Sequence, residues 1–149
     1  MEIFIGCDHA GFALKEALLN ALASFGTVHD LGTKSEERVD YPDFSKRVCE
    51  RVLGTPDSMG LLICGTGIGM SIAANRFRGV RAALCNDAGF SSHFARAHNN
   101  ANILCLGGRL VTPEVAMESV RAFFTTPFEQ GRHTGRVTKI ETCAYEDDA

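Results

Sequence analysis

The sequence lacks several features that would place it in a specialised class of protein. No apolar run approaches the roughly 18 residues that a membrane-spanning helix needs. The first residues, 1–5, lack the basic flank and the long apolar core of a signal peptide, so we expect a soluble, cytoplasmic protein with no membrane partner. Lysine is scarce, with four residues, and the net charge is −3. The chain therefore lacks the electrostatic footprint of a general nucleic-acid binder.

Paired cysteine motifs are absent as well. The six cysteines are scattered, and none belongs to a Cys-x-x-Cys pair: Cys7, Cys49, Cys64, Cys85, Cys105 and Cys143. This scatter argues against a zinc site and a redox pair and, without an export signal, against disulfides. We therefore expect no bound metal, and mostly buried, reduced thiols that act as small hydrophobic side chains.

Length and apolar content are ordinary. The 149 residues, 45% of them apolar and 22% charged, fit one globular domain that buries about two thirds of its surface without disulfides or a metal. No linker or internal repeat divides the sequence. We expect a single domain over 1–149, in which 146–149, the sequence Glu-Asp-Asp-Ala, form a disordered tail.

Five short apolar runs without strict polar alternation are typical of strands buried on both faces: 3–7, 28–31, 61–64, 80–85 and 103–106. Amphipathic stretches predict helices over 14–25, 44–52, 67–76, 88–97 and 113–124, the last capped by Thr112. Parallel strands need such crossover helices, so the sequence predicts an α/β fold, a three-layer α/β/α sandwich around a five-stranded parallel Rossmann-like sheet. In these sheets ligands bind beyond the carboxyl ends of the strands.

The third predicted strand ends at Cys64 and continues into a glycine-rich loop. Gly65, Gly67 and Gly69 let the backbone N–H groups turn inward toward an anion, at the start of the next helix. The loop is not a Walker A motif, and as a dinucleotide fingerprint it has Met70 where the third glycine belongs. A nucleotide-binding module is therefore a weakened alternative.

Two other interpretations of this loop fail. No arginine stands six positions after any cysteine, as a cysteine-dependent phosphatase requires, and a phosphorelay receiver needs an aspartate where Cys64 stands. What remains is a thiol beside an anion nest. Cys7 also ends a strand, but the nest favours Cys64 because it could hold an oxyanion next to the sulfur. Thr66 either offers its hydroxyl to the same reacting atoms or caps the helix.

Polar side chains also follow other predicted strands and helices. Asp8 either caps the first helix or forms an acid/base or phosphate-binding pair with His9. His98 precedes asparagines at 99, 100 and 102, which suit hydroxyl recognition, as in a sugar. Arg132 and Arg136 are four apart, so in a helix they would form a phosphate fork, and a solvated basic turn fits them equally well.

Several segments together resemble the B type of ribose 5-phosphate isomerase, in the ribose/galactose isomerase family. They are 6–12, 40–42, 64–75, 98–102 and 131–136, in the same order and spacing, and the resemblance runs from Ile3 to about Ile140. It implies cofactor-free isomerisation between ribose 5-phosphate and ribulose 5-phosphate through a cis-enediolate, in the pentose phosphate pathway. It also implies a homodimer or homotetramer with active sites at a subunit interface. The family includes allose 6-phosphate and galactose 6-phosphate isomerases, so a hexose 6-phosphate is the alternative substrate.

The resemblance also implies a role for each matched residue. Cys64 would be the base that moves a proton between C1 and C2, and Thr66 would assist proton movement between the two oxygens. His98 would open the furanose ring, with Asp8 helping at the ring oxygens, whereas Cys7 would only pack. The residues that bind the substrate would be His9, Tyr41, Gly65, Gly67, Gly69, Asn99, Arg109, Arg132 and Arg136.

Overall fold

Five parallel strands form the central sheet of the computed structural model, which describes residues 1–143. They are β1 (Glu2–Cys7), β2 (Thr27–Asp30), β3 (Ser58–Cys64), β4 (Ala82–Leu84) and β5 (Ile103–Gly107). Their spatial order is β2-β1-β3-β5-β4, and every neighbouring pair is parallel. The predicted parallel α/β fold is confirmed, whereas the tail predicted at 146–149 lies outside the described residues.

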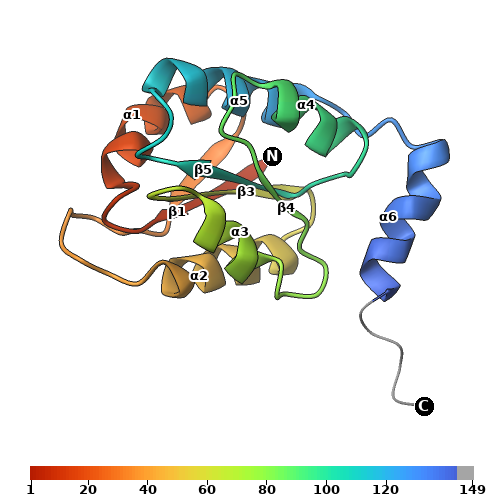
Figure 1. The fold of residues 1–149 in the computed structure, drawn as a ribbon, viewed down its shortest axis with the longest axis horizontal. Helices are drawn as coiled ribbons and strands as arrows, with labels where there is room; N and C mark the ends of the chain where they lie inside the picture. The colour runs from red at the N-terminus through yellow and green to blue at the C-terminus, as the bar shows by residue number, and fades with distance from the viewer. Residues whose placement is uncertain (144–149) are drawn as a thin grey trace, which may run out of the picture.

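Helices cover both faces of the sheet (Figure 1). One face carries α1 (Phe12–Leu22), α4 (Phe90–Ala97) and α5 (Pro113–Thr125), and the other carries α2 (Tyr41–Gly54) and α3 (Ile68–Ala74). Successive side chains of a strand point to opposite faces, so Ile63 belongs to the core cluster of α1 and α5, and Leu62 and Cys64 to that of α2. This alternation turns the Cys64 thiol away from α1.

Several boundaries differ from those predicted, and two of them are informative. Helix α1 ends at Leu22, before the predicted end at residue 25, and a Cβ on Gly26 would lie 2.3 Å from the carbonyl oxygen of Met1. That glycine is therefore needed for a close chain crossing. Strand β4 covers Ala82–Leu84 instead of 80–85, and just before its start the Asn102 side chain, not a neighbouring strand, accepts the Arg81 N–H (2.8 Å). Within residues 1–143, no helix has both the length and the apolar character to cross a membrane.

A sixth helix, α6 (Arg132–Thr142), has no counterpart among the predicted elements. It stands apart from the sheet and its covering helices (Figure 1). His133 is its one buried residue, and Arg81, just before β4, pairs with Glu141 near its end. Its residues are mostly polar or charged, so it lacks the apolar residues from which the other helices were predicted.

Candidate active site

The carboxyl ends of β1 and β3 and the segment after β5 border a hollow of about 470 Å³. The residues that line it are Asp8, Tyr41, Cys64, Gly65, Thr66, Ile68, Gly69, Ile72 and Arg109. A larger hollow of about 640 Å³ lies near the amino ends of the strands, against Met1 and Ser58. Because parallel sheets bind ligands at the carboxyl ends of their strands, the smaller hollow is the candidate site.

Cys64 lies at the floor of this hollow, and its thiol accepts a backbone hydrogen bond. The side chain is 4% exposed, and the N–H of Gly67 donates to Sγ over 3.2 Å. Gly67 adopts a φ of 78°, a left-handed conformation that disfavours any residue with a Cβ. A donor aimed at the sulfur stabilises its thiolate form. The glycine therefore provides the backbone geometry that a thiolate base needs.

Four other thiols are buried without such a role. Burial raises the pKa of Cys7, Cys49 and Cys85 to about 11, and it raises the pKa of Cys105 well above its usual range. These groups are neutral thiols near pH 7 and poor proton acceptors. Cys64 is therefore the thiol that combines a place in the hollow with a hydrogen bond to sulfur.

The other two glycines of the loop allow side chains to approach closely. A Cβ on Gly69 would lie 2.6 Å from Cζ of Tyr41, and one on Gly65 would lie 3.2 Å from Nη1 of Arg109. Tyr41 begins α2, and Arg109 follows β5, so two elements press against the loop. Both side chains therefore border the space above Cys64, as the predicted substrate-binding roles require.

Thr66 and Asp8 both line the hollow and also bond the local backbone. The hydroxyl of Thr66 accepts from the N–H of Ile68 (3.2 Å), and Oδ1 of Asp8 accepts from the N–H groups of Ala10 and Gly11 (3.0 and 3.1 Å). Asp8 thus holds the turn before α1. The N-caps of α1 and α3 are Gly11 and Gly67, so neither Asp8 nor Thr66 is the N-cap that the capping alternatives expected. Their bonds instead fix the two side chains at the edge of the hollow.

His9 turns toward a different loop. The N–H of Val39 donates to its Nδ1 over 3.2 Å, and His9 is not among the residues that line the hollow. This contact ties the end of β1 to the segment that precedes α2.

A second group of predicted site residues lies around the end of α4 and the start of α6. The ring of His98 stacks on that of His133, with centroids 4.1 Å apart and planes 16° from parallel. Burial, followed by the charges of His98 and Arg132, lowers the pKa of His133 below its usual 6.5. Within the described chain, Nε2 of His133 is buried without a hydrogen-bond partner. Sequence reasoning assigned no role to His133.

Within residues 1–143, these two histidines and Glu129 form the one cluster whose ligand atoms lie close enough together to hold a metal. Nε2 of His133 and of His98 lie 3.6 and 3.9 Å from the Glu129 carboxylate, and the candidate ligand atoms all lie within 4.8 Å of one another. Stacked rings aim their nitrogens along nearly parallel lines, whereas a tetrahedral ion requires lone pairs that converge at about 2 Å. The stacked arrangement is therefore not a preformed metal centre.

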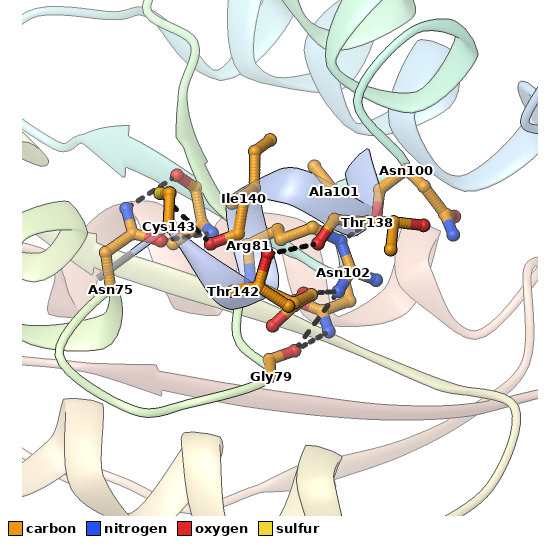
Figure 2. Close-up of polar contacts among 12 residues, drawn as sticks. Asn75, Gly79, Arg81, Asn100, Ala101, Asn102, Thr138, Ile140, Thr142 and Cys143 are labelled. Carbon is orange, nitrogen blue, oxygen red and sulfur yellow. Dashed lines mark hydrogen bonds and ion pairs between the residues drawn. The ribbon is translucent and has the colours of Figure 1, made fainter. Parts of the chain in front are cut away.

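The asparagines near His98 divide between exposed and structural roles. Asn100 adopts a φ of 47° at the end of α4, and Asn102 accepts from Arg81 N–H and donates to the carbonyl of Gly79 (2.8 and 2.9 Å). Figure 2 shows these contacts beside Ile140 of α6. Asn75 brackets both backbone groups of Ala82 in the same way. Asn99, Asn100 and Asn102 were all predicted to suit hydroxyl recognition. Of these three, only Asn99 is exposed, so the structure does not support that role for all of them.

Known proteins are similar to this chain in both sequence and fold. A family model described as Ribose/Galactose Isomerase matches residues 3–140. The chain belongs to the ribose/galactose isomerase family. It is 44% identical over 140 residues to ribose-5-phosphate isomerase B of Escherichia coli, covering 93% of each chain. The structure resembles that of a Thermotoga maritima ribose 5-phosphate isomerase, with 52% identity and a TM-score of 0.89. The match covers 94% of this chain and 97% of the Thermotoga maritima chain. A Clostridium thermocellum Ribose-5-Phosphate Isomerase B has 44% identity, a TM-score of 0.91 and coverage of 97% of both chains.

In this ribose/galactose isomerase, the predicted site residues form two separate groups. The first group lines the hollow: Asp8, Tyr41, Cys64, Gly65, Thr66, Gly69 and Arg109. The N–H of Gly67 donates a hydrogen bond to the thiol of Cys64. His98, Asn99, Arg132 and Arg136 are not among the residues that line it. Arg132 and Arg136 lie on one helix and not in a turn, and both side chains are exposed to solvent. One chain therefore brings the predicted base and anion nest together but leaves the predicted ring-opening group outside.

Proposed function

We propose that this chain interconverts ribose 5-phosphate and ribulose 5-phosphate, as an aldose-ketose isomerase in which Cys64 is the base. The observation that supports this role for Cys64 is the hydrogen bond from Gly67 N–H to its sulfur, inside a hollow at the carboxyl edge of the sheet. The family, and relatives named ribose-5-phosphate isomerase B, support the substrate and with it a place in the pentose phosphate pathway. The glycine loop thus serves an isomerase and not a nucleotide-binding module.

The proposed reaction moves one proton between two carbons and one between two oxygens, and it needs no external reagent. The Cys64 thiolate removes the proton from C2 of the open-chain aldose, and the electrons form a cis-enediolate. Backbone N–H groups of 65–69 other than that of Gly67, which donates to Cys64 Sγ, hold its negative charge. The Thr66 hydroxyl carries a proton between the oxygens of C1 and C2. The Cys64 thiol then returns its proton to C1 to give the ketose. A placed general base typically contributes about 10² to 10⁴ in rate, and an anion hole contributes about as much.

The remaining site residues act before and around this step. His98 opens the furanose ring, with Asp8 at the ring oxygens, and Asn99 binds a hydroxyl. Tyr41 lines the sugar pocket. The guanidinium groups and the second histidine contact the phosphate and the sugar: His9, Arg109, Arg132 and Arg136. Arginine suits this task because its planar fork matches the oxygens of a phosphate.

A complete site needs a second copy of the chain, in a homodimer or in a homotetramer built from such dimers. Two observations support this assembly. His98 and the α6 arginines lie outside the hollow of their own chain, and large apolar side chains are exposed near both groups. Ile72 beside the hollow is 63% exposed, and Phe90 on α4 is 72% exposed. In the proposed dimer, α4 and α6 of the partner cover these surfaces and place His98 over Cys64 of the first chain.

A cytoplasmic location fits this chemistry. The cysteines are all free, and a catalytic thiol keeps its activity in a reducing compartment. The substrate is the only partner that the proposed reaction requires besides a second copy of the chain.

Initial rates on three sugar phosphates test the proposed activity. The purified protein is assayed with ribose 5-phosphate, allose 6-phosphate and galactose 6-phosphate, and we expect the highest kcat/KM with ribose 5-phosphate. A higher kcat/KM on either hexose would replace the proposed substrate, and no turnover of any of the three would contradict the isomerase assignment.

Hybrid dimers test the shared site separately. Differently tagged Cys64→Ala and His98→Asn chains are co-expressed, and the hybrid is purified through both tags. With a shared site, one of its two sites contains both intact groups, so we expect about half of the parent's turnover of ribose 5-phosphate. If each site instead combined Cys64 and His98 of the same chain, both sites of the hybrid would be impaired. Turnover would then stay at the level of the single variants.

A further inference from the structure

The Asn86 side chain bridges the glycine loop and the end of β5. Its Nδ2 donates to the carbonyl oxygen of Thr66 over 2.8 Å, and its Oδ1 accepts from the N–H of Gly107 over 2.7 Å. A carbonyl only accepts and a backbone N–H only donates, so these partners fix which end of the amide faces which element. Asn86 is half-buried between β4 and α4. The neighbouring Asp87, and not Asn86, accepts from the first-turn N–H of Ser91 in α4.

The Thr66 carbonyl belongs to the same peptide unit as the Gly67 N–H that bonds Cys64. A peptide unit is planar and trans, so its C=O and N–H point in opposite directions. An amide that holds the carbonyl of Thr66 therefore also fixes the direction in which the Gly67 N–H points, toward Sγ of Cys64 at 3.2 Å. Hydrogen bonds in such a chain also polarise one another, which strengthens the donor at the sulfur.

The packing around this peptide keeps it in contact with β5. A Cβ on Gly107 would lie 2.7 Å from the carbonyl carbon and oxygen of Thr66, so this glycine permits the close approach. Backbone bonds join the same two segments on either side, from Gly108 N–H to Cys64 O (2.8 Å) and from Arg109 N–H to Gly65 O (3.0 Å). Asn86 is the side chain that holds the peptide between these two backbone links.

We propose that Asn86 is a positioning residue for the thiolate of Cys64, acting through the Thr66–Gly67 peptide. It fixes the Gly67 N–H on the sulfur and so increases the fraction of Cys64 present as thiolate. The role rests on the proposed function only where turnover is concerned, because the thiolate itself can be measured without substrate. Asn86 does not touch the reacting atoms, so its loss should lower kcat and leave KM nearly unchanged.

The test measures Cys64 alkylation in Asn86→Ala as a function of pH. Iodoacetamide reacts with the thiolate, and peptide mass spectrometry follows Cys64 separately from the other cysteines. We expect alkylation of Cys64 near pH 7 to slow about tenfold, its pH midpoint to rise by about one unit, and kcat to fall about tenfold. An unchanged midpoint with unchanged kcat would overturn the proposal.

Asn102→Ala is the matched control. Asn102 is also half-buried and also bridges one backbone N–H and one carbonyl, but it does so at the start of β5, away from the hollow. It should cost similar thermal stability and leave the Cys64 midpoint unchanged. If both variants slow alkylation equally, the effect is general loosening and the proposal fails.

A second variant covers poor folding of Asn86→Ala. Asn86→Asp keeps the shape and the bond from Gly107, but its carboxylate cannot donate to the Thr66 carbonyl and adds a negative charge nearby. Both effects should raise the Cys64 midpoint. An unshifted midpoint in folded Asn86→Asp would overturn the proposal. A shifted midpoint in a protein whose parent has no isomerase activity would refute the proposed function and leave the role of Asn86 intact.

Discussion

The imidazole of His98, at the end of α4, stacks on that of His133 in the first turn of α6, with ring centroids 4.1 Å apart. The ring of Phe94 also contacts His98, with centroids 4.7 Å apart and planes tilted by 55°. The stack holds His98 in one orientation and docks the start of α6 onto the body of the domain. It therefore links the proposed ring-opening group to the helix that carries Arg132 and Arg136.

The first prediction concerns His98→Asn. Ribose 5-phosphate is mostly cyclic, and its ring must be opened before C2 can lose its proton. Ribulose 5-phosphate carries its phosphate on O5 and forms no furanose ring, so it needs no such step. At saturating substrate the variant should lose far more kcat on ribose 5-phosphate than on ribulose 5-phosphate. If His98 acts as a general acid/base, the loss on ribose 5-phosphate should be about 100-fold. Equal losses in both directions, after correction for the reaction equilibrium, would contradict the role.

The second prediction concerns the pH dependence of stability. Because the pKa of His133 lies below its usual 6.5 in the folded chain, the unfolded chain binds more protons as the pH falls through that range. The neutral ring therefore contributes stability that is present above about pH 6.5 and is lost below it. Urea unfolding of the parent should show this loss between pH 7 and pH 5, and His133→Phe, which keeps a stacking ring, should show less of it. The same pH dependence in both proteins would refute the assignment.

A third prediction concerns Lys15, which is fully buried in α1. Its ammonium donates to both carboxylate oxygens of Asp30 (2.8 Å each) and to the carbonyl of Thr33 (2.7 Å). Lys15→Met leaves that carbonyl without its donor, so we expect the free energy of unfolding at pH 7 to fall by about 3 kcal/mol. Lys46→Met is the control, because Lys46 is exposed and its pair with Glu50 is long, at 3.9 Å.

The same variant should change the response to acid. Burial alone would raise the pKa of Asp30, but hydrogen bonds from Lys15, Lys34 and the Gly32 N–H hold it below its usual 3.8. The charged carboxylate therefore contributes stability that is present above about pH 4 and is lost as the pH falls further. This acid-sensitive part should be smaller in Lys15→Met. An unchanged acid transition would show that Lys15 does not hold the Asp30 pKa down.

The sequence predicted those parts of the fold that depend on local signals. Runs such as 3–7 and 61–64 are apolar on both faces, so they predicted central strands, and Thr112 does accept from Val115 N–H at the start of α5. The glycine loop was also predictable as a site, because its glycines and the preceding thiol are consecutive. A short loop needs no tertiary contact to place these groups together.

Contacts between distant segments could not be predicted in this way. Nothing local marks His133 as the partner of His98, and an asparagine before a helix, such as Asn86, is expected to cap it. The actual partners of Asn86 depend on how β3 and β5 are arranged side by side. Likewise, the separation of the Cys64 hollow from His98 became visible only once both lay in one three-dimensional structure.

The most direct test of Cys64 as the base compares two buried cysteines at adjacent strand ends. Cys64→Ala should keep the fold and phosphate binding but lose at least about 100-fold in isomerase kcat, because it removes the proton acceptor. Cys7→Ala removes a thiol whose pKa of about 11 makes it a poor base, so its kcat should stay within a few-fold of the parent. Turnover of ribose 5-phosphate by Cys64→Ala within a few-fold of the parent would contradict the account.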